Sequence, residues 1–214
     1  MLPDYANIVE CPHCQGTKPL LSLLSGNTFE GCQWWDLKED YPMLPHVSFV
    51  QKCPHCGKYF MLSEAKSTKG KEYSLDRGQL SHAELREALA QMSGDKAGKG
   101  RIQLLLEYLW AYNDAFQRER KPFGREHEVA TDRPEPTPEE KAEFQEVVRE
   151  LVATFPVDNK LIYAELLREA GLFDEAMEIV EAGGPQNEAP YIALERIIRE
   201  KCARKDTSVG PVVF

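Results

Sequence analysis

Two copies of one tetrapeptide, Cys-Pro-His-Cys, constrain the folding of this chain more than any other feature of its sequence. They occupy residues 11–14 and 53–56 and contain four of the six cysteines. A Cys-x-x-Cys turn directs two thiolates at one centre, and a following glycine such as Gly57 lets the backbone bend so that its N–H groups face the sulfurs. The first copy departs slightly, because Gln15 precedes its glycine, Gly16. Together the two turns predict one tetrahedral metal site with the ligands Cys11, Cys14, Cys53 and Cys56.

Four thiolates suit Zn²⁺ and also a single iron, since both accept tetrahedral sulfur. A catalytic zinc needs an open coordination position for a polarised water, whereas four thiolates close the shell. A segment of about 60 residues buries too little surface to be comfortably stable alone, and a structural zinc supplies roughly 10 to 16 kcal/mol of apparent binding free energy in small peptides. We therefore expect one structural Zn²⁺ per chain. Disulfides are the alternative, but paired Cys-x-x-Cys motifs in an intracellular chain favour a metal.

The other cysteines and the histidines near the motifs are expected to take no part in metal binding. Cys32 lies beside two tryptophans and is predicted to be a small core residue, while Cys202 lies in a basic helical stretch and is predicted to be free. His13 and His55 occupy positions whose side chains normally point outward, so we expect them to be bystanders. His46 is the one substitute ligand that the sequence offers, and a weak one.

At these residues the N-terminal part of the chain, roughly residues 8–62, resembles the zinc-ribbon and rubredoxin-like group of proteins. The resemblance implies that each Cys-Pro-x-Cys knuckle sits at the tip of a short β-hairpin and that the metal is usually a structural zinc. The interval between the motifs exceeds the roughly 15 to 20 residues of the simple pattern, so an extra segment must lie between them. Residues 47–53 are typical of a strand entering the second knuckle, and residues 59–62 of its return strand.

The chain is predicted to be an α+β protein with two parts. A small β zinc ribbon would occupy residues 1–65, and a helical domain residues 80–206. Between them, residues 63–79 are polar with little periodicity, which is typical of a linker or an exposed crossing. Within the helical part, residues 121–138 hold several prolines among charged residues, which excludes a continuous helix and predicts an exposed connector.

Capping boxes mark the start of two predicted helices. Ser81 and Glu84 frame the first, and Thr137 and Glu140 frame the second, which also has a proline at its first position. Asp158 is predicted to cap a later helix. The remaining predicted helices span residues 101–120, 159–170, 173–182 and 189–205.

Two of these helices are joined by a short turn at Gly171 and should form an antiparallel helical hairpin. Their small and apolar residues resemble one unit of a tetratricopeptide repeat, in which glycine permits the turn and alanine permits close crossing. The matching positions are Ala164, Leu167, Gly171, Ala176 and Val180. The match covers one unit of about 34 residues, whereas a stable stack normally needs about three. The apolar tail at residues 209–214 is expected either to fray or to dock.

The chain is acidic, and the acidity is concentrated in its helical part. The formal net charge is −9, of which the first 78 residues contribute about −1. Most of the carboxylates are expected to line solvated helix surfaces, although an acidic groove could receive a basic peptide. Negative charge repels phosphate backbones and disfavours nucleic acid. No apolar run reaches the roughly 18 residues of a membrane span, and residues 1–10 do not form a signal peptide, so we expect a cytoplasmic protein with no membrane partner.

The motifs of common enzymes are absent from the sequence: it has no nucleotide-binding glycine loop, nucleophile elbow or His-Glu metal helix. The sequence therefore predicts a non-enzymatic protein-interaction module, a structural zinc ribbon plus a helical adaptor for a protein or peptide partner, a basic one being favoured. A nucleic-acid-associated zinc ribbon and a rubredoxin-like iron electron carrier are the alternatives. The layout also resembles small bacterial proteins that begin with paired knuckles and end in helices, and that resemblance implies no particular activity.

Overall fold

The computed structural model describes residues 1–92, 99–118, 134–183, 186 and 188–212. The connector predicted at residues 121–138 lies outside these residues up to residue 133. None of the helices in the described ranges combines the length and the apolar character that crossing a membrane would require.

Contacts within the chain divide it into two units, and the α+β class predicted from the sequence is confirmed. The first unit comprises Met1–Gly31 and Asp40–Ala111, and the second comprises Cys32–Glu39 and Tyr112–Phe214. This division differs from the predicted domain boundaries. A short segment before the second knuckle groups with the C-terminal helices, whereas the first helix and most of the second group with the strands.

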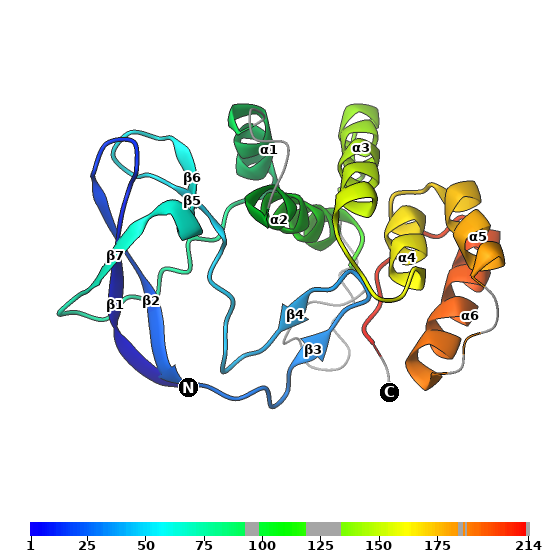
Figure 1. The fold of residues 1–214 in the computed structure, drawn as a ribbon, viewed down its shortest axis with the longest axis horizontal. Helices are drawn as coiled ribbons and strands as arrows, with labels where there is room; N and C mark the ends of the chain where they lie inside the picture. The colour runs from blue at the N-terminus through cyan, green and yellow to red at the C-terminus, as the bar shows by residue number, and fades with distance from the viewer. Residues whose placement is uncertain (93–98, 119–133, 184–185, 187, 213–214) are drawn as a thin grey trace. The chain divides into compact units, whose positions relative to one another are not determined.

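The first unit contains two small antiparallel sheets (Figure 1). In the larger sheet, β1 (Leu2–Glu10) lies between β2 (Thr17–Ser25) and β7 (Lys66–Lys69). The smaller sheet pairs β5 (Val50–Lys52) with β6 (Tyr59–Met61). The two hairpins predicted around the knuckles are therefore present.

The strand β7 corrects the expectation that residues 63–79 are only a linker. A turn of 3₁₀ helix, η1 (Leu62–Glu64), leads into it, and β7 pairs antiparallel with β1 from Asn7 to Glu10. All four β7 side chains are exposed. The pairing therefore rests on backbone hydrogen bonds, and the lysines at this sheet edge discourage pairing with other chains.

Two helices complete the first unit. The helix α1 (His82–Gln91) begins with the predicted capping box, in which the Ser81 side chain accepts from the Glu84 N–H and Glu84 reaches back. The helix α2 (Lys99–Phe116) continues into the second unit and is deeply buried through its leucines and tyrosines. Its Glu107 is a buried exception that accepts hydrogen bonds from Ser48 Oγ and from the Phe49 N–H, both at 2.5 Å. This carboxylate anchors the segment that leads into β5.

The second unit is helical, apart from a short strand pair of β3 (Cys32–Gln33) with β4 (Glu39–Asp40), whose last residue belongs to the first unit. The capping box of Thr137 and Glu140 is confirmed at the start of α3. The helices after α2 are α3 (Pro138–Thr154), α4 (Leu161–Glu169), α5 (Phe173–Ala182) and α6 (Ala189–Arg204).

The helical hairpin predicted from the Gly171 turn is formed by α4 and α5. Gly171 has φ +74°, a left-handed conformation that favours glycine, and Ala164 and Ala176 are fully buried where the two helices pack. The predicted cap at Asp158 is wrong: the Asn159 side chain accepts the Leu161 N–H at 2.9 Å.

The C-terminal tail docks as far as residue 212. The Val209 N–H donates to the Gln117 carbonyl at 3.0 Å, and the Val212 N–H donates to the Gln33 carbonyl at 2.7 Å. Val209 is fully buried. This tail therefore ties residues 32–39 to the end of α2 within the second unit.

Candidate metal centre

Each Cys-Pro-His-Cys motif forms the loop that closes one hairpin. Glu10 pairs with Thr17 at the ends of β1 and β2, and Lys52 pairs with Tyr59 at the ends of β5 and β6. Each residue of the first loop has its counterpart 42 positions later in the second. The two loops therefore have the same length and leave their strands at equivalent positions.

The two loops also share one backbone conformation. In the first, the Cys11 N–H donates to the Gly16 carbonyl at 2.9 Å, and the Gln15 N–H donates to the Cys11 carbonyl at 2.9 Å; residues 53–58 repeat both bonds at 2.9 and 3.0 Å. Gln15 has φ 61° and Gly57 has φ 71°. The left-handed position of the knuckle is thus taken by glycine in the second copy and by glutamine in the first, which explains the departure seen in the sequence.

The four cysteine sulfurs form one compact cluster. Cys11 Sγ lies 3.9 Å from Cys56 Sγ, and Cys14 Sγ lies 3.6 Å from Cys53 Sγ, so each close pair joins the two loops. All four sulfurs lie within 4.8 Å of one another. A tetrahedral site with metal–sulfur bonds of about 2.3 Å requires sulfur–sulfur distances of about 3.8 Å. The cluster can therefore hold one metal ion, and tetrahedral sulfur is accepted by both zinc and iron.

Two of the thiols, those of Cys53 and Cys14, have pKa values that are shifted in opposite directions. Burial raises the pKa of Cys53, but the Cys56 and His55 N–H groups and the neighbouring thiols outweigh it and lower that pKa to about 6. The Gly16 N–H lowers the pKa of Cys14, yet desolvation and the other three thiols raise it to about 12. A bound dication favours the thiolate form at every ligand. Metal binding should therefore release protons and weaken as the pH falls.

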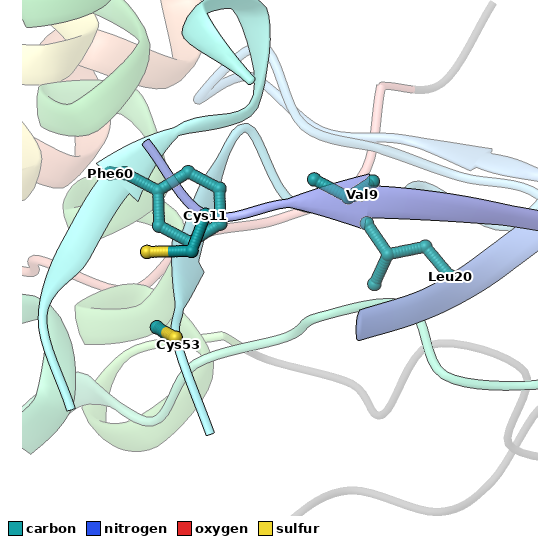
Figure 2. Packing of buried hydrophobic residues seen from close by; sticks show 5 residues of the cluster. All are labelled: Val9, Cys11, Leu20, Cys53 and Phe60. Carbon is teal, nitrogen blue, oxygen red and sulfur yellow. The ribbon is translucent and has the colours of Figure 1, made fainter. Parts of the chain in front are cut away.

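A small apolar cluster supports one side of the site (Figure 2). Cys11 and Cys53 are buried among Val9, Leu20 and Phe60, which come from β1, β2 and β6. Cys14 and Cys56 are exposed. The ligand pairs thus each combine one buried and one exposed cysteine, and the buried member of each pair belongs to the core of the unit.

The remaining cysteines lie away from this cluster, as predicted. Cys32 is half-buried, and its thiol lies 3.6 Å from the Gln33 carbonyl oxygen. Cys202 is buried in α6, and burial raises its pKa. His46 is not a ligand, because its Nε2 lies 3.1 Å from a carboxylate oxygen of Glu107.

The two motif histidines lie outside the group of candidate ligands, as expected, but each contacts the opposite hairpin. His13 Nε2 lies 3.1 Å from the Tyr59 carbonyl oxygen, and His55 Nε2 lies 3.0 Å from the Thr17 carbonyl oxygen. Each histidine thus reaches from its own knuckle to the first residue of the return strand on the other hairpin. The only sign of these two contacts in the sequence is that histidine occupies the same position in both motifs.

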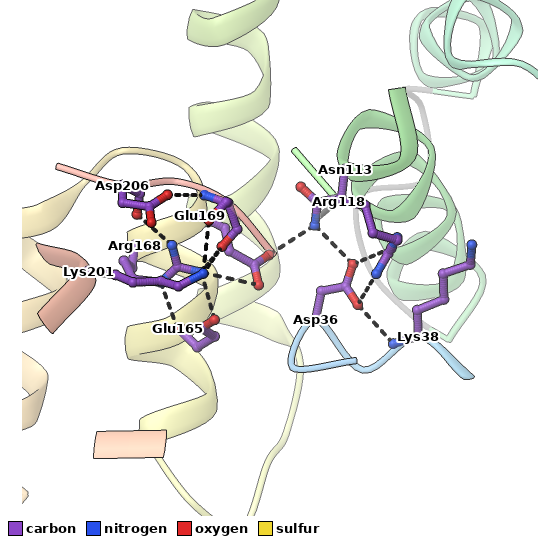
Figure 3. A network of polar contacts seen from close by, with 10 residues as sticks. Asp36, Lys38, Asn113, Arg118, Glu165, Arg168, Glu169, Lys201 and Asp206 are labelled. Carbon is purple, nitrogen blue, oxygen red and sulfur yellow. Dashed lines mark hydrogen bonds and ion pairs between the residues drawn. The ribbon is translucent and has the colours of Figure 1, made fainter. Parts of the chain in front are cut away.

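Sequence reasoning also missed a set of buried charges in the second unit (Figure 3). Arg118 and Asp36 are 1% and 0% exposed, and Arg118 Nη2 lies 2.7 Å from Asp36 Oδ2. The guanidinium also lies 4.4 Å from the ring centroid of Trp34 and pairs with Asp114. Burial alone would lower the pKa of Arg118, but the two aspartates raise it. Arg118 is therefore charged, and its charge is balanced locally.

A second buried pair lies on α4, an exception to the expectation that most carboxylates of the helical part line solvated surfaces. Arg168 donates to both oxygens of Glu165, at 2.8 and 2.7 Å, and both side chains are buried. Its remaining donors reach the carbonyl oxygens of Asp206 and Ser208 at 2.6 and 3.0 Å. The arginine thus ties α4 to the segment that follows α6.

Glu169 joins these two groups. Asn113 Nδ2 donates to Asp36 Oδ2 at 2.9 Å and to Glu169 Oε2 at 3.0 Å, so the amide lies between two buried acids. Glu169 is 0% exposed, and Arg168 Nη2 lies 3.9 Å from its other oxygen. Burial, followed by the charges of Asp36 and Glu165, raises the pKa of Glu169 well above its ordinary value. The buried site therefore favours the protonated form of this carboxyl group more than water does.

Glu169→Gln is expected to be tolerated, because glutamine has nearly the same shape as glutamate and its carbonyl oxygen can still accept from Asn113. The folded-state pKa of Glu169 is raised, so its contribution to stability is full below the unfolded value of about 4.5 and is lost as the pH rises through the folded value. Glutamine does not titrate, so the variant does not lose stability in this way as the pH rises. The free energy of unfolding of the variant should therefore increase relative to that of the wild type as the pH rises, by at most about 1.4 kcal/mol per pH unit.

Urea unfolding at a series of pH values above 4.5 measures this difference. A constant difference across the series would show that folding does not raise the pKa of Glu169.

Comparison with known proteins gives no relative for this chain: no protein family, curated protein or solved structure matches it.

Proposed function

We propose that this chain is a non-enzymatic protein-interaction module whose N-terminal ribbon is fixed by one structural Zn²⁺. The ligands would be Cys11, Cys14, Cys53 and Cys56. The helical hairpins of the second unit would present a surface to a protein or peptide partner. The observation that carries the proposal is the closed set of four sulfurs within 4.8 Å, contributed by the tips of two hairpins.

A structural role suits this donor set. The sheets that carry the two knuckles share no strand, so the metal would crosslink hairpins that are not joined by backbone pairing. Four protein ligands leave no coordination position for water or substrate. Zinc bound in this way would stabilise the fold without taking part in a reaction.

Purified full-length protein is expected to contain one zinc per chain, measured by elemental analysis after expression without added metal. A colourless protein with one zinc supports the proposal. One iron with a visible charge-transfer colour would support the electron-carrier alternative instead, and two metals or none would contradict the assignment.

The interaction role is supported by the acidity of the second unit. On α5, Asp174, Glu178 and Glu181 are exposed and follow one another at spacings of four and three residues, so they share one face of the helix. Such a stripe attracts a basic segment and repels phosphate. A partner enriched in lysine and arginine is therefore favoured over nucleic acid.

The double variant Glu178→Gln/Glu181→Gln is expected to recover less of any lysine- and arginine-rich partner in pull-downs from the native cell. The control is Glu64→Gln/Glu72→Gln, which removes the same charge from exposed positions of the first unit. Binding should also weaken with salt, since charges are screened over about 8 to 10 Å at physiological ionic strength. Equal recovery by both variants would exclude the stripe, and tight nucleic-acid binding at about 150 mM salt would contradict the proposal as a whole.

A further inference from the structure

The two motif histidines make reciprocal contacts across the sulfur cluster. His13 reaches the Tyr59 carbonyl oxygen at 3.1 Å, and His55 reaches the Thr17 carbonyl oxygen at 3.0 Å. Tyr59 and Thr17 occupy equivalent positions, because each is the first residue of its return strand. The contacts therefore form a symmetric pair, one on each loop.

The chemistry of the acceptor fixes the role of each histidine. A backbone carbonyl oxygen can only accept a hydrogen bond, so the imidazole Nε2 must carry the proton and donate it. Each ring thus donates from one hairpin to the other. The close sulfur pairs, Cys11 with Cys56 and Cys14 with Cys53, also connect the two loops.

Packing around His55 also indicates that its side chain has a specific place against the opposite loop. Gly16 has a backbone conformation outside the left-handed region, so its turn does not itself require glycine. A methyl group added at Gly16 would overlap the His55 ring, with His55 Cγ only 2.7 Å away. The equivalent position in the second loop is Lys58. Glycine at position 16 therefore leaves room for the histidine of the opposite knuckle.

We propose that His13 and His55 are positioning residues for the metal, because each fixes the spacing of the two knuckles through a hydrogen bond to the opposite hairpin. This inference rests on the proposed metal binding. The histidines do not contact the metal; they act through the cysteines that flank them. Groups that orient metal ligands typically contribute 10- to 100-fold to metal affinity.

Co²⁺ titration of the full-length protein against a competing chelator tests this role. His13→Ala and His55→Ala are each expected to raise the Kd about 10-fold and to change the ligand-field absorption of bound Co²⁺, because the sulfur geometry is less restricted. His13→Gln and His55→Gln should restore much of the affinity, since the glutamine amide offers an N–H donor. Gly16→Ala should resemble His55→Ala, whereas Lys58→Ala should resemble the wild type.

The outcomes separate this inference from the proposed function. Wild-type protein that binds no Co²⁺ would overturn both. Wild-type protein that binds one Co²⁺, with alanine variants of unchanged Kd and absorption, would overturn only the positioning role. Weakened alanine variants that glutamine does not improve would also overturn it, because the loss would then not come from the donated hydrogen bond.

Discussion

Replacing any one of Cys11, Cys14, Cys53 or Cys56 with serine is expected to abolish the proposed metal binding and to unfold the two knuckle hairpins. The loss should be the largest that a single substitution causes in this chain, because structural zinc supplies roughly 10 to 16 kcal/mol in small peptides, as much as the whole stability of a typical domain. Cys11 and Cys53 are buried, so a serine there also leaves a hydroxyl group in the apolar cluster. Elemental analysis and hydrogen exchange of β1, β2, β5 and β6 measure the two effects.

Cys32→Ser and Cys202→Ser are the matched controls. Both cysteines lie outside the sulfur cluster, and both belong to the second unit. These variants should keep one metal per chain and the exchange protection of the hairpins. A cluster variant that retains stoichiometric metal and protected hairpins would contradict the assignment of that cysteine as a ligand.

Local patterns predicted the parts of this fold that local chemistry determines. The repeated knuckle needs only its own six-residue loop, and the capping boxes at Ser81 and Thr137 need only one helical turn. The hairpin of α4 and α5 follows from a short turn at Gly171. Each of these signals lies within a few residues, so one sequence was sufficient to find it.

Features that depend on distant residues could not be found in this way. The strand β7 is polar and pairs through its backbone with β1, so its side chains carry no alternating pattern. Glu169 lies on a helix rich in charges, and its burial depends on Asn113 and Arg168, one of which is far away in the sequence. The histidine contacts join residues that only the fold brings together. In each case the missing information was a tertiary contact.

Removing the charge of Arg118 is expected to destabilise the second unit strongly. In Arg118→Met the carboxylate of Asp36 stays buried and loses its arginine, while the hydrogen bonds from Asn113 and from the Lys38 N–H are among the contacts that remain. Removing one partner of a buried ion pair typically costs about 3 to 5 kcal/mol. Asp36→Asn should cost less, because Arg118 still pairs with Asp114. Urea unfolding monitored by tryptophan fluorescence measures both losses, since Trp34 lies against Arg118.

The double variant Asp36→Asn/Arg118→Met decides whether this cost comes from the buried charge. Once Asp36 is neutral, losing Arg118 no longer leaves a buried carboxylate without its arginine, so the double variant should be more stable than Arg118→Met alone. Arg149→Met is the control, because its pair with Glu175 is exposed, at 48% and 45%, and such pairs contribute about 0 to 1 kcal/mol. If Arg118→Met cost no more than Arg149→Met, the buried pair would not stabilise the unit. If the double variant were the least stable, the loss would come from packing of the arginine side chain against Trp34 instead of its charge.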